Sequence, residues 1–347
     1  MKRIVASLLV FVCLSFSFTS AAFADENEDQ KNRDTMGFTV ETVLPSNQVD
    51  PSRSFYFLKV TPGEAQRIQL KIISTRKEAR TVKVSLNDAM TSSEASIDYG
   101  VDKPELDDSL QNPVTELVKV PEEFKEVTVE NYEEKTIELE ITPPQEEFSG
   151  IKLGAIRLIG VPNDSESKKT GLKVETGYTI GMVLTEDAAQ YNSGGELHFK
   201  KADVFLSNGS KVVGVSLQND QPKMIDQMKM NVKVRKKGFD KVLYEKKGED
   251  LSVAPNTNFT YQVPLGLENV EAGKYSVEIV AQNEEKTWKW TKEISITNEA
   301  ANKLNDEAVD KVITPSWVPI ATVVLALALV ILVVIIMNRN RSFQRKK

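Results

Sequence analysis

The sequence predicts an all-β fold, with two immunoglobulin-like β-sandwich domains in tandem and one C-terminal transmembrane helix. Short runs of alternating apolar and polar residues recur along the chain, and turn residues separate them at a spacing of about 8 to 12 residues, as in β-sandwiches. The part between the two apolar ends of this 347-residue chain is long enough to build two cores. An uncharged apolar run near the C-terminus has the length of a membrane span.

The N-terminus has the three-part layout of a secretory signal peptide, which we expect to comprise residues 1–24. Lys2 and Arg3 precede an apolar run over residues 4–18, and small residues lead up to Ala24. The alternative, an uncleaved amphipathic anchor, would need charges within the apolar run, which has none. Residues 25–36 are mostly polar and are expected to form a disordered leader.

Residues 37–161 predict the first sandwich, and residues 172–298 predict the second. The polar stretch 162–171 between them is either a hinge or a long hairpin loop, and we place the domain boundary there. In the second half, Asn208-Gly209 is a strong signal for a tight turn. The alternating runs expected to be strands are 38–43, 55–60, 67–72, 81–86, 126–129, 135–141 and 151–158, then 174–184, 197–206, 211–217, 228–235, 241–244, 259–263, 275–281 and 287–296.

The remaining residues predict a stalk, a membrane span and a tail. In the stalk, residues 299–316, Leu304 and Ala308 lie at helical spacing and favour a short helix, with a flexible tether as the alternative. Residues 317–337 carry no charge, and as a helix they would extend over about 31 Å. The basic tail 338–347 is expected to be cytoplasmic. The sequence thus predicts a single-pass cell-membrane protein with an extracellular ectodomain.

Composition excludes several classes of function. Seven of the 44 basic residues lie outside residues 25–316, which leaves 37 basic against 50 acidic side chains and a net charge of about −13 in the ectodomain. Nucleic acid is therefore not an expected ligand. The only cysteine, Cys13, lies in the signal peptide, and the only histidine, His198, lacks metal-ligand spacing around it. We predict no catalytic residue, no metal and no cofactor.

Eight short motifs occur in a characteristic order along the ectodomain. They are 44–48 (LPSNQ), 56–63 (YFLKVTPG), 97–99 (IDY), 148–154 (FSGIKLG), 217–222 (LQNDQP), 254–259 (APNTNF), 272–275 (AGKY) and 288–290 (WKW). In this order they resemble the WxL-interacting proteins of Gram-positive bacteria, and the resemblance covers nearly the whole ectodomain. One departure is Glu94-Ala95-Ser96, which stands where the family pattern often has a glycine.

The resemblance implies a division of labour between the two domains. The first is similar to the family's peptidoglycan-binding domain, and the second to the domain credited with binding host extracellular-matrix proteins. Members of the family are thought to act beside secreted WxL-motif surface proteins. The expected function is therefore a non-catalytic, membrane-anchored protein that bridges peptidoglycan, WxL-domain proteins and host proteins.

Four residues of the first domain are candidates for peptidoglycan binding. The side-chain amides of Asn47 and Gln48 suit sugar hydroxyls and N-acetyl groups, although they would equally satisfy local backbone groups in a turn. The rings of Tyr56 and Tyr99 could stack on the face of a sugar.

Trp288 and Trp290 in the second domain are the candidates for partner binding, with packing inside the sandwich as the alternative. Two other functions stay open. Glutamate doublets such as Glu146-Glu147 would suit a membrane-anchored cell-wall hydrolase, which needs paired carboxylates. An exposed edge strand would suit an assembly chaperone for WxL proteins.

Overall fold

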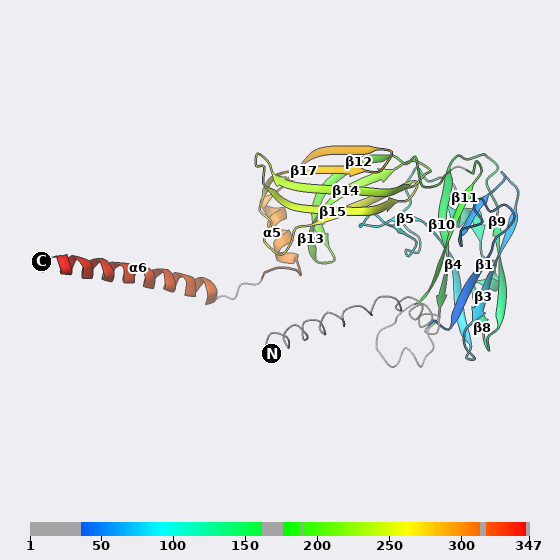
Figure 1. Ribbon diagram of the computed structural model, residues 1–347, viewed down its shortest axis with the longest axis horizontal. Helices are drawn as coiled ribbons and strands as arrows, with labels where there is room; N and C mark the ends of the chain where they lie inside the picture. Colours follow the sequence, from blue (N-terminus) through cyan, green and yellow to red (C-terminus); the bar gives the residue numbers. More distant parts are fainter. Residues whose placement is uncertain (1–35, 162–175, 189, 313–316, 345–347) are drawn as a thin grey trace, which may run out of the picture.

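The computed structural model describes residues 36–161, 176–188, 190–312 and 317–344. The expected signal peptide, residues 25–35 of the expected leader, the boundary stretch 162–171 and the last three tail residues lie outside these ranges. Two β-domains meet at one end of each, and their strands run in different directions, so that the pair has the shape of an L (Figure 1).

The first domain is a sandwich of a four-stranded and a five-stranded sheet, and neighbouring strands are antiparallel except for β2 and β11. The four-stranded sheet has the order β1 (Phe38–Val43), β3 (Gln66–Ser74), β9 (Glu134–Ile141), β7 (Val118–Lys119). The five-stranded sheet has the order β2 (Tyr56–Lys59), β11 (Gly177–Thr185), β10 (Ile151–Gly160), β4 (Arg80–Asp88), β8 (Glu126–Val129). The short helices α3 (Val114–Leu117) and η1 (Glu122–Phe124) lie in its connections.

Alternation along each strand explains why these residues form sheets. In β3, Ile68, Leu70 and Ile72 are buried in the core of the first domain, and the residues between them face outward. On the outer face, Gln69 Nε2 donates to Glu138 Oε1 of β9 at 2.8 Å. The apolar face supplies the main stabilisation, since each buried aliphatic side chain contributes roughly 1.5–3 kcal/mol.

The position of β11 differs from the sequence prediction, which placed residues 174–184 in the second domain. The strand lies between β2 and β10 in the first domain, pairing with β10 from Ile151↔Thr185 to Ile159↔Gly177. Alternation predicts that a strand forms, but not which sheet it joins, because that depends on contacts with residues far away in the sequence.

The second domain is a sandwich of a three-stranded and a four-stranded sheet, with all pairs antiparallel. The first has the order β12 (Leu197–Ser207), β13 (Ser210–Asn219), β16 (Thr257–Pro264). The second has the order β15 (Val242–Val253), β14 (Ile225–Lys236), β17 (Gly273–Gln282), β18 (Thr287–Ile296). The predicted turn at Asn208-Gly209 joins β12 to β13, and both residues have a positive φ. The prediction of two mostly β sandwiches is confirmed.

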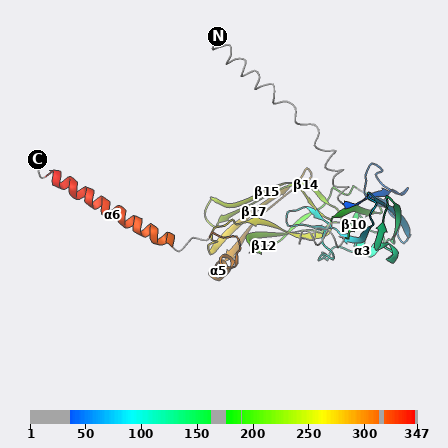
Figure 2. The same cartoon turned by 90° about the horizontal axis from the view of Figure 1, so that it is seen from below.

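The helix expected in the stalk forms, but it does not stand free. Helix α5 (Asn298–Glu307) begins at Thr297, whose side chain accepts a hydrogen bond from the backbone N–H of Ala300. Its apolar face, with Ala301 and Leu304, is buried. Figures 1 and 2 both place α5 at the end of the second domain that lies away from the first. Residues 298–310 are therefore part of the domain rather than a spacer.

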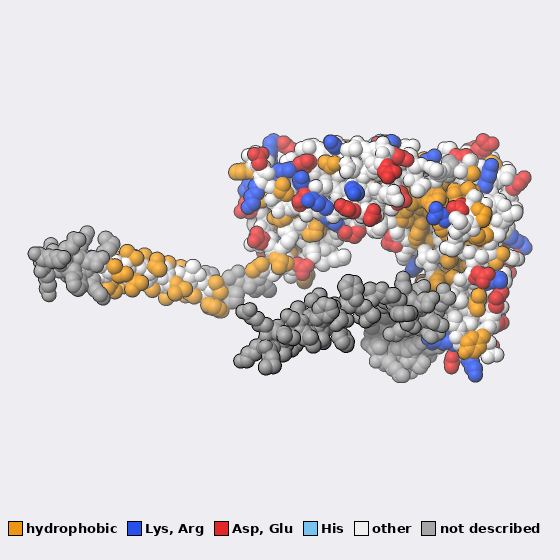
Figure 3. Space-filling model, viewed as in Figure 1, with side chains coloured by type: hydrophobic (Ala, Val, Ile, Leu, Met, Phe, Trp, Pro, Cys, Tyr) orange, Lys and Arg blue, Asp and Glu red, His pale blue; other side chains and the backbone are white. Residues whose placement is uncertain are grey.

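Helix α6 (Trp317–Gln344) follows after the residues 313–316. Its large apolar side chains between Trp317 and Ile336, apart from the half-buried Val318, are 47–71% exposed and form an apolar surface along the helix (Figure 3). Among the side chains that are described, which leave out residues 319 and 337–347, no helix reaches the length and apolar character needed to cross a membrane.

The two domains share an interface that the sequence did not predict. A segment of the first domain, residues 89–111, leaves β4 and packs on the second; it includes the short strands β5 (Met90–Thr91) and β6 (Ile97–Asp98). Ala95 of this segment is fully buried in the core of the second domain, and its carbonyl accepts from Ser252 N–H at 2.9 Å. Ala95 has a φ of 55°, in the left-handed region that favours glycine.

Candidate functional site

A pocket of about 440 Å³ opens where the two domains meet, and we call it the junction pocket. It is lined by the rings of Phe55, Tyr99 and Tyr191, by the hydroxyl-bearing residues Ser54 and Thr179, and by Asp226, among other residues. Figure 3 shows hydrophobic side chains gathered on the surface where the domains join. The pocket combines ring edges with a few polar groups, as ligand sites of proteins commonly do.

The first wall of the pocket is positioned by Gln48. Its Nε2 donates to the carbonyl of Phe55 at 2.9 Å, and its Oε1 accepts from the N–H of Phe57 at 3.0 Å. These bonds hold the chain that enters β2 in one conformation. The ring of Phe57 in turn lies edge-on to the ring of Tyr191, with centroids 5.2 Å apart. Gln48, expected to touch a sugar, instead orients residues that line or support the pocket.

The second wall carries Tyr99, whose segment is fixed by the buried Asn87. The Nδ2 of Asn87 donates to the Tyr99 carbonyl at 2.8 Å and to the Val101 carbonyl at 3.1 Å. Burial raises the pKa of the Tyr99 phenol to about 12, and the nearby Tyr191 raises it as well. Tyr99 therefore remains a neutral hydroxyl that can donate or accept a hydrogen bond at any physiological pH.

The third wall comes from the second domain. The carbonyl of Tyr191, in the connection that precedes β12, accepts from Met224 N–H at 3.0 Å, which ties that connection to the start of β14. The carboxylate of Asp226 accepts from the Ser252 hydroxyl at 2.6 Å. Because the walls belong to different domains, the pocket exists only while the domains keep their present arrangement.

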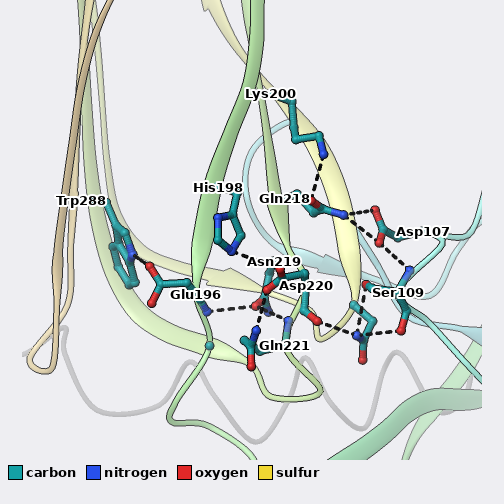
Figure 4. A network of polar contacts seen from close by, with 12 residues as sticks. Asp107, Ser109, Glu196, His198, Lys200, Gln218, Asn219, Asp220, Gln221 and Trp288 are labelled. Carbon is teal, nitrogen blue, oxygen red and sulfur yellow. Dashed lines mark hydrogen bonds and ion pairs between the residues drawn. The ribbon is translucent and has the colours of Figure 1, made fainter.

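A polar network across the boundary between the domains holds that arrangement (Figure 4). Asp107 of the first domain accepts hydrogen bonds from Gln218 and from Asn258 of the second, each at 2.9 Å. Burial raises the pKa of the Asp107 carboxyl, but hydrogen bonds from Ser109, Asn258 and Gln218 outweigh it and lower the pKa to about 2. Asp107 is thus ionised near neutral pH, and its charge is stabilised by donors from both domains.

Residues of the motif 254–259 extend this network. Asn256 donates through Nδ2 to the Ser109 carbonyl at 3.1 Å and to the Asp220 carbonyl at 3.0 Å. The hydroxyls of Thr91 and Thr257, one from each domain, are 2.8 Å apart and buried. Motif residues 217–222 and 254–259 therefore join the domains to each other, which explains their residue types without a ligand.

One of the four predicted glycan contacts, Tyr56, is corrected by the structure, and Asn47 has the turn role that was its alternative. Tyr56 is fully buried, and its hydroxyl donates to the Gln69 carbonyl at 2.7 Å, so its ring cannot stack on a sugar. Asn47 donates through Nδ2 to the Lys59 carbonyl at 2.7 Å and to Gln66 Oε1 at 2.8 Å, as a turn residue does. Of the four, only Tyr99 lines the junction pocket.

The two tryptophans also differ from each other. Trp288 is 6% exposed, and its Nε1 donates to Glu196 at 2.7 Å, so the expectation that it contacts a partner is wrong. Its side chain faces the core because alternate residues of β18 face inward. Trp290 is half-buried and packs beside Phe199, with ring centroids 6.4 Å apart. Lys292 lies over the other ring, 4.8 Å from the centroid of Phe199.

Apart from Tyr99, the residues that line the junction pocket were not predicted from the sequence, among them Phe55, Tyr191 and Asp226. Phe55 shares one face of the predicted strand 55–60 with Phe57, and this alternation favours packing in the core over lining a pocket. Tyr191 lies in a polar, glycine-containing stretch of the sequence. An aromatic residue in such a loop is a signal for a binding residue. For Asp226 the sequence offers no signal, since its neighbours read as an ordinary strand start.

A second pocket, of about 590 Å³, lies at the opposite end of β2 and includes Glu147, Glu186 and Asp187 in its lining. Glu186 accepts from Phe148 N–H at 2.9 Å, and Asp187 accepts from the Thr185 hydroxyl at 2.8 Å. At least two of its carboxylates therefore hold the local backbone and side chains in place. Its doublet residue Glu147 comes from one of the pairs considered for a hydrolase.

Two tightly coupled β-sandwiches with an aromatic pocket at their junction are the framework of a binding protein. Family comparison agrees: residues 38–159 match the model described as "WxL Interacting Protein, peptidoglycan binding domain", and residues 167–306 match "WxL Interacting Protein, host binding domain". The chain belongs to the WxL Interacting Protein family, and the resemblance seen in the sequence is confirmed. The second match begins before β11, although β11 lies in a sheet of the first domain.

A search among curated proteins finds no significant match. Among solved structures, the class 5 fimbriae chaperone CfaA is 14% identical, with a TM-score of 0.29 over 74% of this chain and 98% of its own. The CupB2 chaperone of Pseudomonas aeruginosa is also 14% identical, with a TM-score of 0.29 over 68% of this chain and 96% of its own. The CsuC–CsuE chaperone–subunit complex of Acinetobacter baumannii gives 10% identity and a TM-score of 0.30, over 73% and 97%. Likenesses this distant do not bear on function.

Proposed function

We propose that this protein is a non-catalytic, membrane-anchored surface protein whose junction pocket binds a glycan portion of peptidoglycan. The main support for this proposal is the match of residues 38–159 to a peptidoglycan-binding domain. The rings of Phe55, Tyr99 and Tyr191 supply apolar edges for a sugar ring, and Ser54, Thr179 and Asp226 supply polar partners for its hydroxyls.

The ligand is expected to be a largely uncharged sugar. The ectodomain carries a net charge of about −13, so anionic wall polymers are repelled on average. Asp226 is the one acidic side chain among the described residues that line the pocket. A single carboxylate favours binding over cleavage, because glycosidases generally use two.

The second domain is proposed to bind proteins, namely WxL-domain surface proteins and host extracellular-matrix proteins. The match to a host binding domain and the family's name support this assignment. Trp290, Phe199 and Lys292 form a partly exposed group with aromatic area and a positive charge, which suits a protein partner. The apolar run of α6, in which most large side chains are 47–71% exposed, supports anchoring in the membrane.

Sedimentation with purified peptidoglycan tests the glycan site. The wild type should sediment with the wall material. Moderate salt should not release it, because salt weakens attraction between opposite charges and the proposed binding does not depend on such attraction. Tyr99→Ala and Tyr191→Ala should each weaken binding several-fold, because a stacking ring contributes about 0.5–1.5 kcal/mol beyond area burial. Tyr132→Ala is the matched control, because Tyr132 is 61% exposed in a turn of the first domain that does not line the pocket.

Three results would contradict the proposal: equal binding by all three variants, loss of binding in moderate salt, or binding that resides entirely in residues 190–298. Release of soluble fragments during long incubation would favour the cell-wall hydrolase instead. A pull-down with purified WxL-domain protein, comparing wild type with Trp290→Ala, tests the partner site separately.

A further inference from the structure

The end of the second domain that lies away from the first carries apolar side chains open to solvent. Phe239 is in the turn between β14 and β15 and is 65% exposed, and Leu267 is in the connection between β16 and β17 and is 54% exposed. We call the loops 236–241 and 265–272 the distal loops. Single exposed apolar side chains are common on protein surfaces, so the case for a contact surface rests on what surrounds these two.

A glycine of the same kind precedes each of these apolar residues. Gly238 has a φ of +84° and Gly266 a φ of +71°, and a Cβ added to either would meet no atom within 4 Å. The left-handed backbone turns the chain sharply at the outer limit of each loop. Phe239 and Leu267 therefore stand at loop tips that the rest of the domain does not cover.

Both loops are fixed to the domain, so their tips keep a defined direction. The buried Lys211 donates through Nζ to the carbonyls of Leu267 and Glu268, at 3.2 and 2.7 Å. The N–H of Lys237 donates to the Lys274 carbonyl at 2.8 Å, and Lys236 pairs with Glu271 at 2.9 Å, which joins the two loops to each other.

The chain leaves the domain beside these loops. Asn305 of α5 exchanges two hydrogen bonds with the backbone of Val270, and Val309 N–H donates to the Gly209 carbonyl at 2.9 Å. The carboxylate of Asp310 accepts from the Ser210 hydroxyl. The chain is therefore held to the same end of the domain until residue 310, and Val312 just beyond is 64% exposed.

The length of the connection limits how far this end can be from α6. Six residues, 311–316, separate Asp310 from Trp317. Even fully extended, seven steps of about 3.3–3.6 Å reach only about 25 Å. If α6 spans the membrane with Trp317 at its interface, the distal loops must lie close to the lipid surface.

The charges around the tips are compatible with lipid headgroups. Lys237 pairs with Glu293 at 2.7 Å, whereas the exposed Lys241 has no ion-pair partner among the described residues and is free to meet a lipid phosphate. Asp240 and Glu268 are acidic, so attraction by net charge is not the main term. Contact would instead rest on the transfer of apolar side chains out of water.

We propose that the distal loops dock on the outer surface of the membrane, with Phe239 and Leu267 inserted among the lipid headgroups and upper acyl chains. The inference rests on the proposed anchoring of the chain through α6. It places the second domain directly on the membrane and directs the first domain, at the other end of the L, toward the wall.

Site-specific fluorescence in vesicles tests the proposal with the full chain. Phe239→Cys and Leu267→Cys are made in a Cys13→Ser background, labelled with nitrobenzoxadiazole and reconstituted in vesicles of phosphatidylcholine and phosphatidylglycerol. Nitroxide-labelled lipids in the outer leaflet should quench most of the emission at both positions, and the emission should shift to the blue. Tyr132→Cys, equally exposed on the first domain, should show neither effect.

The outcomes separate this proposal from the anchoring on which it depends. If the chain floats with vesicles but the two probes are not quenched, the distal loops do not touch the membrane although the anchor holds. If the chain does not float, the anchor itself is overturned. Quenching at Tyr132→Cys as well would indicate non-specific contact, and a blue shift without quenching would indicate a protein partner; either result overturns the proposal.

Discussion

The carboxylate of Asp107 accepts hydrogen bonds at both oxygens from the side-chain amide of Gln218, each at 2.9 Å, across the boundary between the two domains. These residues are 111 positions apart in the sequence. Their contact is part of the network that keeps the junction pocket in one shape, and it should be measurable through the charge of Asp107.

Asp107→Asn should destabilise the protein at neutral pH by about 1.5–3 kcal/mol, the typical contribution of hydrogen bonds to a charged group. The folded pKa of Asp107, about 2, lies below its ordinary value of 3.8. The stabilisation is therefore complete above about pH 4 and is lost as the pH falls toward 2. Melting temperatures of wild type and variant should converge on acidification. Asp108→Asn, at an exposed neighbour, is the control, and a gap that is independent of pH would refute this account.

Gly150→Ala should weaken the domain interface. Gly150 has a φ of +76°, and an added Cβ would lie 2.3 Å from the Pro222 carbonyl oxygen of the second domain. The left-handed conformation alone costs a non-glycine residue roughly 1–2 kcal/mol, and the overlap adds to this. Gly238→Ala has the same backbone penalty but open space around it, so thermal unfolding should show a clearly larger loss for Gly150→Ala. Equal losses of stability in the two variants would mean that the interface rearranges around the added methyl group at little cost.

Cleavage within residues 162–171 should not release two independent domains. The piece beginning after the cut retains β11, which pairs with both β2 and β10 of the other piece. The segment 89–111 adds the buried contact between Thr91 and Thr257. After proteolysis at an inserted site, the two pieces should elute together in size-exclusion chromatography without denaturant. Separate elution of folded pieces would restore the domain boundary that the sequence predicted.

Tyr56→Phe should reduce stability without affecting peptidoglycan binding. The substitution removes the bond from the hydroxyl to the Gln69 carbonyl, at a cost of about 0.5–1.5 kcal/mol. The ring itself is fully buried and cannot reach a glycan. Chemical denaturation and sedimentation, both performed well below the melting temperature, measure the two effects separately. A large loss of binding in the folded variant would show that Tyr56 acts on the site after all.

The positions of the strands and the family could be predicted from the sequence, because both depend on local patterns. Alternation of apolar and polar residues with a period of two is visible in a single strand such as β3, and the order of short motifs needs no knowledge of contacts. The same local view predicted the turn at Asn208-Gly209 and the helix near Leu304.

The candidate site could be predicted only in part. Tyr56 and Tyr99 both belong to family motifs and have the same chemistry, yet the first is fully buried and the second lines the junction pocket. Gln48 was selected for its amide, and the structure uses that amide to hold Phe55 and Phe57. Residue type indicates which interactions a side chain can make, but the fold determines which groups lie within reach of it.

The sequence by itself determined the all-β class, the order of the strands along the chain and membership in the family, since period-two alternation and short motifs are properties of neighbouring residues. Only the tertiary structure decided that β11 joins the first domain, that the motifs around Gln218 and Asn256 join the domains, and that the chain stays docked until Asp310. The physical reason is that each of these depends on hydrogen bonds and burial between residues tens to more than a hundred positions apart, where local periodicity carries no information.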